Sequence, residues 1–185
     1  MNAVAELPHV AITTRPAGIA DVPAIVALVE SAYRGESSRA GWTTEADLID
    51  GGRTDAEMVR AALVAVGQVI LVVGPRGRPL ACCSLTYRDG RVWLGTFAVD
   101  PQRQGRGIGD RLLAEAERYA VSRWGVSDVF LLVIAQRPEL IAWYERRGFV
   151  TTGETEPFPY GDERYGLPRR DDLRLNVMRH PLRGA

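Results

Sequence analysis

Residues 97–109 read Phe97-Ala98-Val99-Asp100-Pro101-Gln102-Arg103-Gln104-Gly105-Arg106-Gly107-Ile108-Gly109. This stretch begins as a β-rich run, passes through glycines at alternate positions, and continues into a segment whose apolar residues recur at helical spacing. It therefore predicts a strand, a short loop and a helix that extends to about Trp124. Glycine lets the backbone approach a ligand closely, and the free N–H groups at a helix start attract anions. We expect a diphosphate to bind here, assisted by Arg103 and Arg106.

Two other phosphate-binding motifs do not fit these residues. A P-loop needs a lysine, and all 23 basic residues of this chain are arginines. A dinucleotide-binding fingerprint needs glycine at the position where Asp110 stands, and a carboxylate there would repel phosphate. The remaining alternative is that residues 97–109 form only a tight connection between a strand and a helix.

The regions on either side of the loop predict a sheet flanked by helices. β-rich runs separated by turn sequences predict an antiparallel meander over residues 69–73, 80–87 and 91–99. Further strands are expected at residues 10–15, 129–135, 149–152 and 173–178, and residues 129–135 are apolar enough to be buried on both faces. Helices are expected at residues 21–33, 44–49, 54–66 and 138–148, with Thr54 and Glu57 as a capping box. This order predicts an α/β (α+β) fold in a single domain spanning residues 1–185.

The composition excludes several classes of protein. The 23 basic and 23 acidic residues leave no formal net charge, so there is no electrostatic reason to expect a nucleic-acid or membrane partner. The start of the chain has no targeting pattern and the longest apolar runs are too short to span a bilayer, so we expect a cytoplasmic protein. Cys82 and Cys83 are adjacent and cannot join distant segments, while His9 and His180 lie near opposite ends. The sequence thus predicts no disulfide scaffold, metal site or Ser-His-Asp triad.

The glycine loop resembles the signature of a known family. Gln104-x-x-Gly107-x-Gly109, preceded by Phe97-x-Val99-x-Pro101, is similar to the acetyl-CoA signature of the GNAT family of N-acetyltransferases. A second motif of that family, a tyrosine followed by charged residues and Gly-Phe, is matched by Trp143-Tyr144-Glu145-Arg146-Arg147-Gly148-Phe149. The resemblance covers residues 68–155. It implies a mixed, mostly antiparallel central sheet in which one parallel pair of strands splays apart.

The resemblance also implies that acetyl-CoA is the co-substrate and that no metal takes part. Pantetheine would lie between the strand ending at Val99 and the strand at residues 129–134, with the diphosphate on residues 104–109. Arg137 stands where relatives commonly have asparagine, and it would either reach a phosphate of the cofactor or cap the helix that starts at Pro138. The implied cofactor-binding residues are Phe97, Ala98, Val99, Gln104, Gly105, Arg106, Gly107, Ile108, Gly109, Asp110 and Arg137.

For catalysis, the resemblance implies direct attack of a primary amine, with Tyr144 as the general acid that protonates the leaving sulfur. A base is also needed, because an alkylamine is almost entirely protonated at neutral pH. Many relatives have a glutamate in the strand before the glycine loop, but residues 93–97 contain no carboxylate. A water relay is one alternative, and a carboxylate from Glu36, Glu45 or Asp47 is another.

The acceptor in this family binds between the first helical connection and the last loop, here residues 35–52 and 156–170. The expected acceptor-binding residues are Glu36, Trp42, Glu45 and Tyr160, and the acidic residues of both loops would suit a cationic amine. A non-catalytic acyl-CoA-binding module and a transferase of a longer acyl group remain alternatives. An edge strand at the C-terminus would offer a surface for a homodimer.

Overall fold

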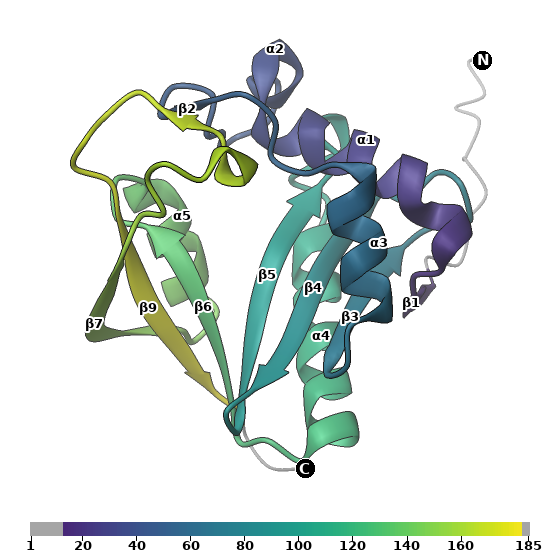
Figure 1. Ribbon diagram of the computed structural model, residues 1–185. Helices are drawn as coiled ribbons and strands as arrows, with labels where there is room; N and C mark the ends of the chain where they lie inside the picture. Colours follow the sequence, from purple (N-terminus) through teal and green to yellow (C-terminus); the bar gives the residue numbers. More distant parts are fainter. Residues whose placement is uncertain (1–12, 183–185) are drawn as a thin grey trace, which may run out of the picture.

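A computed structural model describes residues 13–182 of the chain. A seven-stranded sheet forms its centre, in the order β1-β3-β4-β5-β6-β9-β7 (Figure 1). Every neighbouring pair is antiparallel except β5 and β6, which run parallel, so the expected mixed, mostly antiparallel sheet is confirmed. The strands of this sheet are β1 (Thr14–Pro16), β3 (Gln68–Val73), β4 (Ala81–Arg88), β5 (Arg91–Val99), β6 (Asp128–Ile134), β7 (Val150–Pro157) and β9 (Arg174–Pro181).

Helices cover both faces of the sheet. α1 (Val22–Tyr33) and α3 (Ala56–Val64) pack on one face, and α4 (Ile108–Trp124) and α5 (Pro138–Glu145) pack on the other. The short helix α2 (Gly35–Ser38) follows α1. A second, two-stranded sheet pairs β2 (Ile49–Asp50) with β8 (Leu167–Pro168). Figure 1 shows this small sheet at the end of the molecule where β5 and β6 diverge, so the first and last loops are tied together there.

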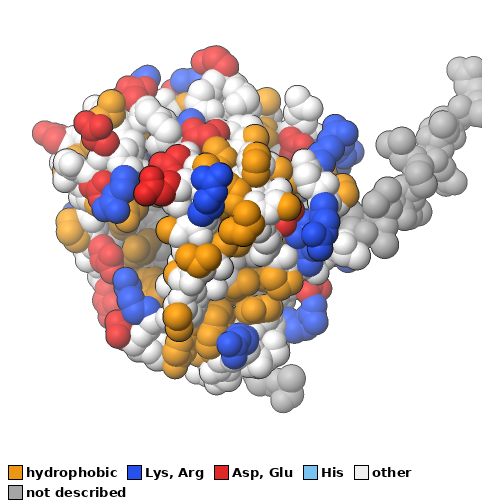
Figure 2. Space-filling model, turned by 45° about the vertical axis from the view of Figure 1, so that its right-hand side comes forward, with side chains coloured by type: hydrophobic (Ala, Val, Ile, Leu, Met, Phe, Trp, Pro, Cys, Tyr) orange, Lys and Arg blue, Asp and Glu red, His pale blue; other side chains and the backbone are white. Residues whose placement is uncertain are grey.

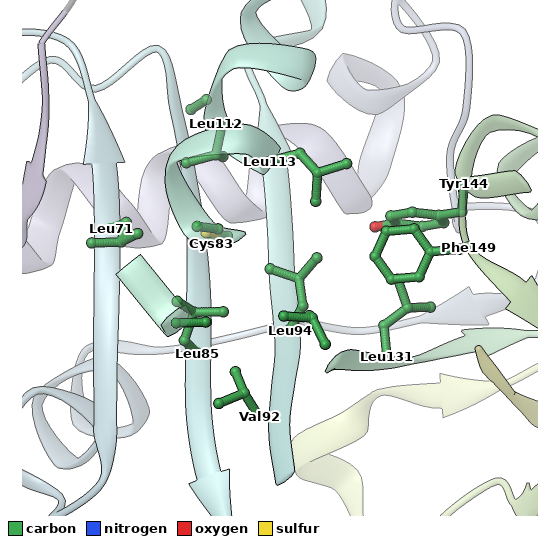
Figure 3. Close-up of a cluster of buried hydrophobic side chains, with 14 of the residues drawn as sticks. Leu71, Cys83, Leu85, Val92, Leu94, Leu112, Leu113, Leu131, Tyr144 and Phe149 are labelled. Atoms are coloured by element: carbon green, nitrogen blue, oxygen red, sulfur yellow. The ribbon is translucent and has the colours of Figure 1, made fainter. Parts of the chain in front are cut away.

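The core is divided by the sheet into two layers. Side chains alternate along a strand, so the neighbours Cys82 and Cys83 are buried in different hydrophobic clusters, as their adjacency predicts. Figure 3 shows the larger cluster, in which leucines of β3, β4 and β5 meet Leu112 and Leu113 of α4. Burying each such side chain contributes roughly 1.5–3 kcal/mol, and this layer holds α4 against the strand that leads into it.

The parallel pair opens part of the way along its length. β5 and β6 are paired only from Val92 to Leu94, opposite residues 129–131. Beyond that point β5 bulges, because Gly95 pairs with Ser84 while Ala98 pairs with Cys82, which sets two residues of β5 against one of β4. Thr96, inside the bulge, has a φ of 44°. The strands then separate towards the small sheet (Figure 1), and the expected splay is present.

One expected helix is absent and several expected boundaries are wrong, among them the end of α5 at Glu145 and not at residue 148, and the end of β7 at Pro157 and not at residue 152. Residues 44–49 form no helix, because the Thr44 hydroxyl accepts a hydrogen bond from the Ala46 amide (3.0 Å) and lies 2.6 Å from the Ser38 hydroxyl, which replaces a helical ladder. The cap of α3 is Asp55, one residue later than expected, whose carboxylate accepts from the Met58 amide at 2.7 Å. α3 also ends at Val64. Of the expected first strand, residues 10–12 lie outside the described residues.

Two expectations about the sheet are corrected as well. β6 is not buried on both faces, because Leu132 is 38% exposed where β5 has moved away from it. The C-terminal strand β9 is not an edge strand, because it lies between β6 and β7. The edges are β1 and β7, so pairing of copies at the C-terminal strand is not open to this fold.

Apolar side chains also gather on the surface of the face that carries α3, as Figure 2 shows. Ile19, Val64 and Val66 are 59%, 75% and 102% exposed. Among the helices of residues 13–182, none has the length and apolar character needed to cross a bilayer.

Candidate active site

Two cavities meet at the opening between β5 and β6. The first, of about 440 Å³, extends from the start of α4 to the end of β5 and to α5. The second, of about 400 Å³, lies in the splay itself, between residues 95–97 of β5 and residues 131–134 of β6. The two cavities share five lining residues, which mark their junction: Tyr33, Phe97, Arg137, Leu140 and Tyr144.

The glycine loop has the backbone of an anion cradle at the mouth of the first cavity. Gly105 and Gly107 both have a φ of 74°, in the left-handed region that favours glycine, and Gly107 caps α4. A Cβ at either position would meet no heavy atom within 4 Å, so the backbone conformation and not crowding selects glycine. The first amides of α4 have no partner inside the helix, and they lie beside the cavity. Such a cradle fits a diphosphate.

Gln104 and Gly109 shape the wall of this cavity. The side chain of Gln104 accepts a hydrogen bond from the Trp42 amide (2.9 Å) and donates one to the Val99 carbonyl (3.3 Å). It therefore fastens the first loop to the end of β5. A Cβ on Gly109 would lie 3.3 Å from the Trp143 ring, so the close packing of α4 on α5 needs a small residue there.

Asp110 lines the first cavity without presenting a free negative charge. Its carboxylate accepts a hydrogen bond from Arg147, whose guanidinium lies 3.6 Å from the centre of the Trp143 ring and also donates to the Trp143 carbonyl (2.9 Å). The ion pair thus offsets the charge that would repel a phosphate. Arg106 is exposed beside the loop and is not part of the cavity lining.

Tyr144 projects from α5 into the junction of the two cavities. It is 6% exposed, and its ring packs edge-on against Phe97 and Phe149, with centroids 6.4 and 5.2 Å away. Figure 3 shows the two rings together, with the phenolic oxygen pointing away from α5. That oxygen has no hydrogen-bond partner within residues 13–182. Burial raises the pKa of Tyr144 well above its usual value, so the phenol keeps its proton.

Tyr33 is a junction residue that the sequence did not indicate. It is the last residue of α1, and its hydroxyl donates a 3.0 Å hydrogen bond to the Phe97 carbonyl inside the bulge of β5. Burial raises the pKa of Tyr33 to about 12. The two residues are 64 positions apart, and no local pattern at Tyr33 distinguishes it from a core aromatic.

A buried ionic cluster closes the far side of the junction. Arg34, Glu45 and Arg137 have side chains only 6%, 9% and 6% exposed. One oxygen of Glu45 accepts from Arg34 and the other accepts from Arg137 at 2.9 Å. Arg137 also donates to the Thr43 hydroxyl at 2.6 Å, so its side chain is turned towards the first loop. The Nε atoms of both arginines are buried without a hydrogen-bond partner.

The other expected acceptor residues are spread around the site. Glu36 lies on α2 and pairs with Arg39 at 3.1 Å, outside both cavities, and Asp47 pairs with the same arginine at 2.7 Å. Trp42 lines the first cavity and stacks on Trp143. The Tyr160 hydroxyl donates to the Arg170 carbonyl and accepts from the Leu173 amide, outside both cavities. Thus the acidic side chains do not line the junction as free charges.

The fold and this site define a class of acyl-CoA-dependent transferases, and comparison with known proteins agrees. Residues 30–149 match the model of the acetyltransferase (GNAT) family, and the chain belongs to that family. Among curated proteins, the spermine/spermidine N(1)-acetyltransferase of Bacillus subtilis strain 168 is 29% identical over 69 residues. That match covers 37% of this chain and 45% of the relative, so it spans less than half of the relative's length.

Solved structures share the fold. The ribosomal-protein-alanine N-acetyltransferase of Brucella melitensis superposes with a TM-score of 0.67 at 23% identity, covering 92% of this chain and 100% of that one. The ribosomal-protein-S18-alanine N-acetyltransferase of Escherichia coli gives 0.65 at 20% identity, covering 94% and 95%. A Salmonella typhimurium chain solved with its cofactor acetyl-CoA gives 0.63 at 22% identity, covering 94% and 95%.

Proposed function

We propose that this chain is an N-acetyltransferase that moves the acetyl group of acetyl-CoA directly to a primary amine of a small molecule or peptide. The observation that carries the proposal is the junction of two cavities at Tyr144. One cavity begins at an anion cradle and the other opens in the splay of the sheet. A donor and an acceptor bound in separate cavities would meet at one buried proton donor. The family to which the chain belongs supports the same assignment.

The first cavity suits the donor. The amides around Gly105 and Gly107 would hold the diphosphate, with Arg146 adding positive charge at the rim. The end of β5, residues 97–99, would face pantetheine, because these residues line the first cavity and the pairing of β5 with β6 stops at Leu94. Acetyl-CoA supplies the reactive thioester, and the residues of this chain bind and orient it. The cavity ends at Tyr144, where the thioester would be placed.

In the proposed reaction the amine nitrogen forms a bond with the thioester carbonyl carbon, and the carbon–sulfur bond breaks. The electron pair of that bond leaves with the sulfur. Tyr144 donates its proton to this thiolate and later recovers a proton from solvent. The extra proton of the acetylated nitrogen passes to water. General acid help of this kind typically contributes about a hundred- to ten-thousand-fold in rate.

The amine must lose a proton before it attacks. Nearby arginines can favour this loss without a dedicated base, because their positive charge lowers the pKa of the amine. Glu45 is the one carboxylate lining the second cavity within the described residues, and both of its oxygens already accept from guanidinium groups. Positive charge near a bound ammonium group disfavours its charged form and lowers its pKa. The neutral amine would therefore be favoured at Arg34 and Arg137, with water carrying the proton away.

The acid role of Tyr144 is tested by Tyr144→Phe, which removes the hydroxyl and keeps the ring packing. We expect kcat to fall by about a hundred- to ten-thousand-fold, measured as thiol release from acetyl-CoA across a panel of amines. The dissociation constant for acetyl-CoA, measured by calorimetry, should stay within about two-fold. Tyr119→Phe is the matched control, because Tyr119 is a packed tyrosine on α4 that lines neither cavity. Equal losses in turnover and binding for Tyr144→Phe would reject the acid role.

A second candidate is a non-catalytic acyl-CoA-binding module, favoured by the pairing of Glu45 and the absence of another carboxylate from the described lining of the second cavity. Binding of acetyl-CoA without thiol release on any amine or peptide would support this function. A transferase of longer acyl groups is a variant of the leading proposal. Thiol release measured with acyl-CoA donors of increasing chain length separates the two.

A further inference from the structure

The second cavity is lined by more positive than negative charge. Its charged lining residues are four arginines and one glutamate, namely Arg34, Arg53, Arg88, Arg137 and Glu45. Glu45 is shared between Arg34 and Arg137, so one carboxylate faces two buried guanidinium groups. A guanidinium group keeps its proton in proteins, so an arginine cannot relieve this excess by becoming neutral. Burying an uncompensated charge costs several kcal/mol.

The nearby carboxylates outside the cavity compensate this charge only in part. Glu139 lies 3.7 Å from Nε of Arg137, beyond hydrogen-bond distance, and its side chain is 43% exposed. Asp89 lies 3.8 Å from Arg88 at the exposed end of β4. The second cavity therefore retains a positive field at its buried end.

Arg53 is an accessible positive group in the lining of the second cavity. It is half-buried, lines the second cavity, and its guanidinium lies 5.3 Å from the centre of the Tyr33 ring. The neighbouring carboxylate of Glu30 accepts from the backbone amides of Arg53 and Thr54 at 2.6 and 2.8 Å, not from the Arg53 side chain. Within residues 13–182 the Arg53 guanidinium forms no ion pair. A planar guanidinium with free donors is the group that pairs best with a carboxylate.

We infer that the acceptor carries a carboxylate as well as its amine, and that Arg53 is a specificity-determining residue that binds this carboxylate. The inference rests on the proposed transferase function and names the class of its acceptor, an amino acid or a compound of the same two-ended chemistry. The carboxylate would pair with Arg53 over the Tyr33 ring. The amine would lie at the junction beside Tyr144.

The same charges disfavour a polyamine as acceptor. Spermidine carries several positive charges at neutral pH, and like charges placed together in a partly desolvated cavity repel. Two acidic residues of the loops around the site are paired elsewhere, Asp47 with Arg39 and Asp162 with Arg164. A curated relative is named for polyamines, but the charges that line this cavity favour an anionic group.

The test compares acceptors that differ only in the carboxylate. A set of α- and ω-amino acids is assayed against the carboxamide of each and against spermidine, by thiol release and by calorimetry on the complex with CoA. Loss of one charge-assisted hydrogen bond corresponds to about a ten- to hundred-fold change in affinity. We expect kcat/KM and affinity to be higher by about that factor for at least one acid than for its amide. Spermidine should be a poor acceptor.

Arg53→Gln should raise KM for the acid by about ten- to hundred-fold and change KM for the amide much less, so that most of the preference for the acid is lost. Arg91→Gln is the matched control, because Arg91 also lies over an aromatic ring, 4.9 Å from the centre of Phe130, but outside the cavity. Equal use of acids and amides, a preference for spermidine, or an equal loss on both acceptors in Arg53→Gln would overturn the inference. If no acceptor causes thiol release, the proposed transferase function is wrong. Calorimetry then still shows whether the carboxylate of the acceptor binds at Arg53.

Discussion

Removal of the charge of Glu45 tests the buried ionic cluster most directly. The variant Glu45→Gln keeps the length of the side chain but leaves Arg34 and Arg137 facing a neutral amide. All three side chains are less than a tenth exposed, so solvent cannot screen the two guanidinium groups. Removing one partner from a buried charge network typically costs about 3–5 kcal/mol. For a chain of this size that loss lowers Tm by roughly 6–20 °C.

The assay is urea denaturation followed by circular dichroism, which gives the free energy of unfolding and the m-value for each protein. Glu36→Gln is the control, because Glu36 pairs with Arg39 while its side chain is 92% exposed, and an exposed pair contributes about 0–1 kcal/mol. A loss below about 1 kcal/mol for Glu45→Gln would refute the reasoning. It would mean that water reaches the cluster and that the charges there are screened.

Two further predictions concern the glycine loop and the start of α1. Gly107→Ala forces a φ of 74° on a residue with a Cβ, at a cost of about 1–2 kcal/mol, and should weaken acetyl-CoA binding in calorimetry by about ten-fold or more. The control is Gly77→Ala, because Gly77 has the same φ, lies in the turn before β4 and has equally open space around it. This variant should lose a similar amount of stability and keep the affinity for acetyl-CoA. Weakened binding in both variants would contradict a role for the glycine loop. Hydrogen bonds from Arg15 lower the pKa of Asp21 from 3.8 to about 2. The carboxylate therefore stabilises the fold when the pH is above 3.8, and this contribution is lost as the pH falls towards 2. Asp21→Asn should therefore lower the free energy of unfolding by roughly 2 kcal/mol near pH 7 and by almost nothing near pH 2. A loss that does not depend on pH would count against this role of the Asp21 carboxylate.

Local patterns were sufficient for most of the fold. The meander over β3, β4 and β5 and the long helix α4 follow from strand periodicity, turn residues and helical spacing. The expected helix at residues 44–49 is absent because the Thr44 hydroxyl contacts Ser38 and the Ala46 amide instead. Glu45 in this segment is buried against Arg34 and Arg137, 11 and 92 positions away. Its side chain could not be recognised as buried from its neighbours alone, because a glutamate in a polar segment usually faces solvent.

Local patterns also indicated part of the lining of the first cavity. The glycine loop and Tyr144 lie in continuous motifs, and both line the first cavity. Tyr33, Leu140 and Arg53 were not indicated, because each lies on a different element and they meet only when β5 and β6 separate. An arginine such as Arg53 has the same sequence signature whether it lines a cavity or extends into solvent.

The amino-acid sequence by itself determined the order of elements and the glycine backbone at the start of α4, because these depend on residues close together along the chain. The tertiary structure alone decided the charge of the second cavity. Glu45 and Arg137 are 92 positions apart, and their hydrogen bond exists because β5 and β6 splay and the first loop folds over the opening. Charges act through space, so their balance in a cavity is set by which distant segments the fold brings together.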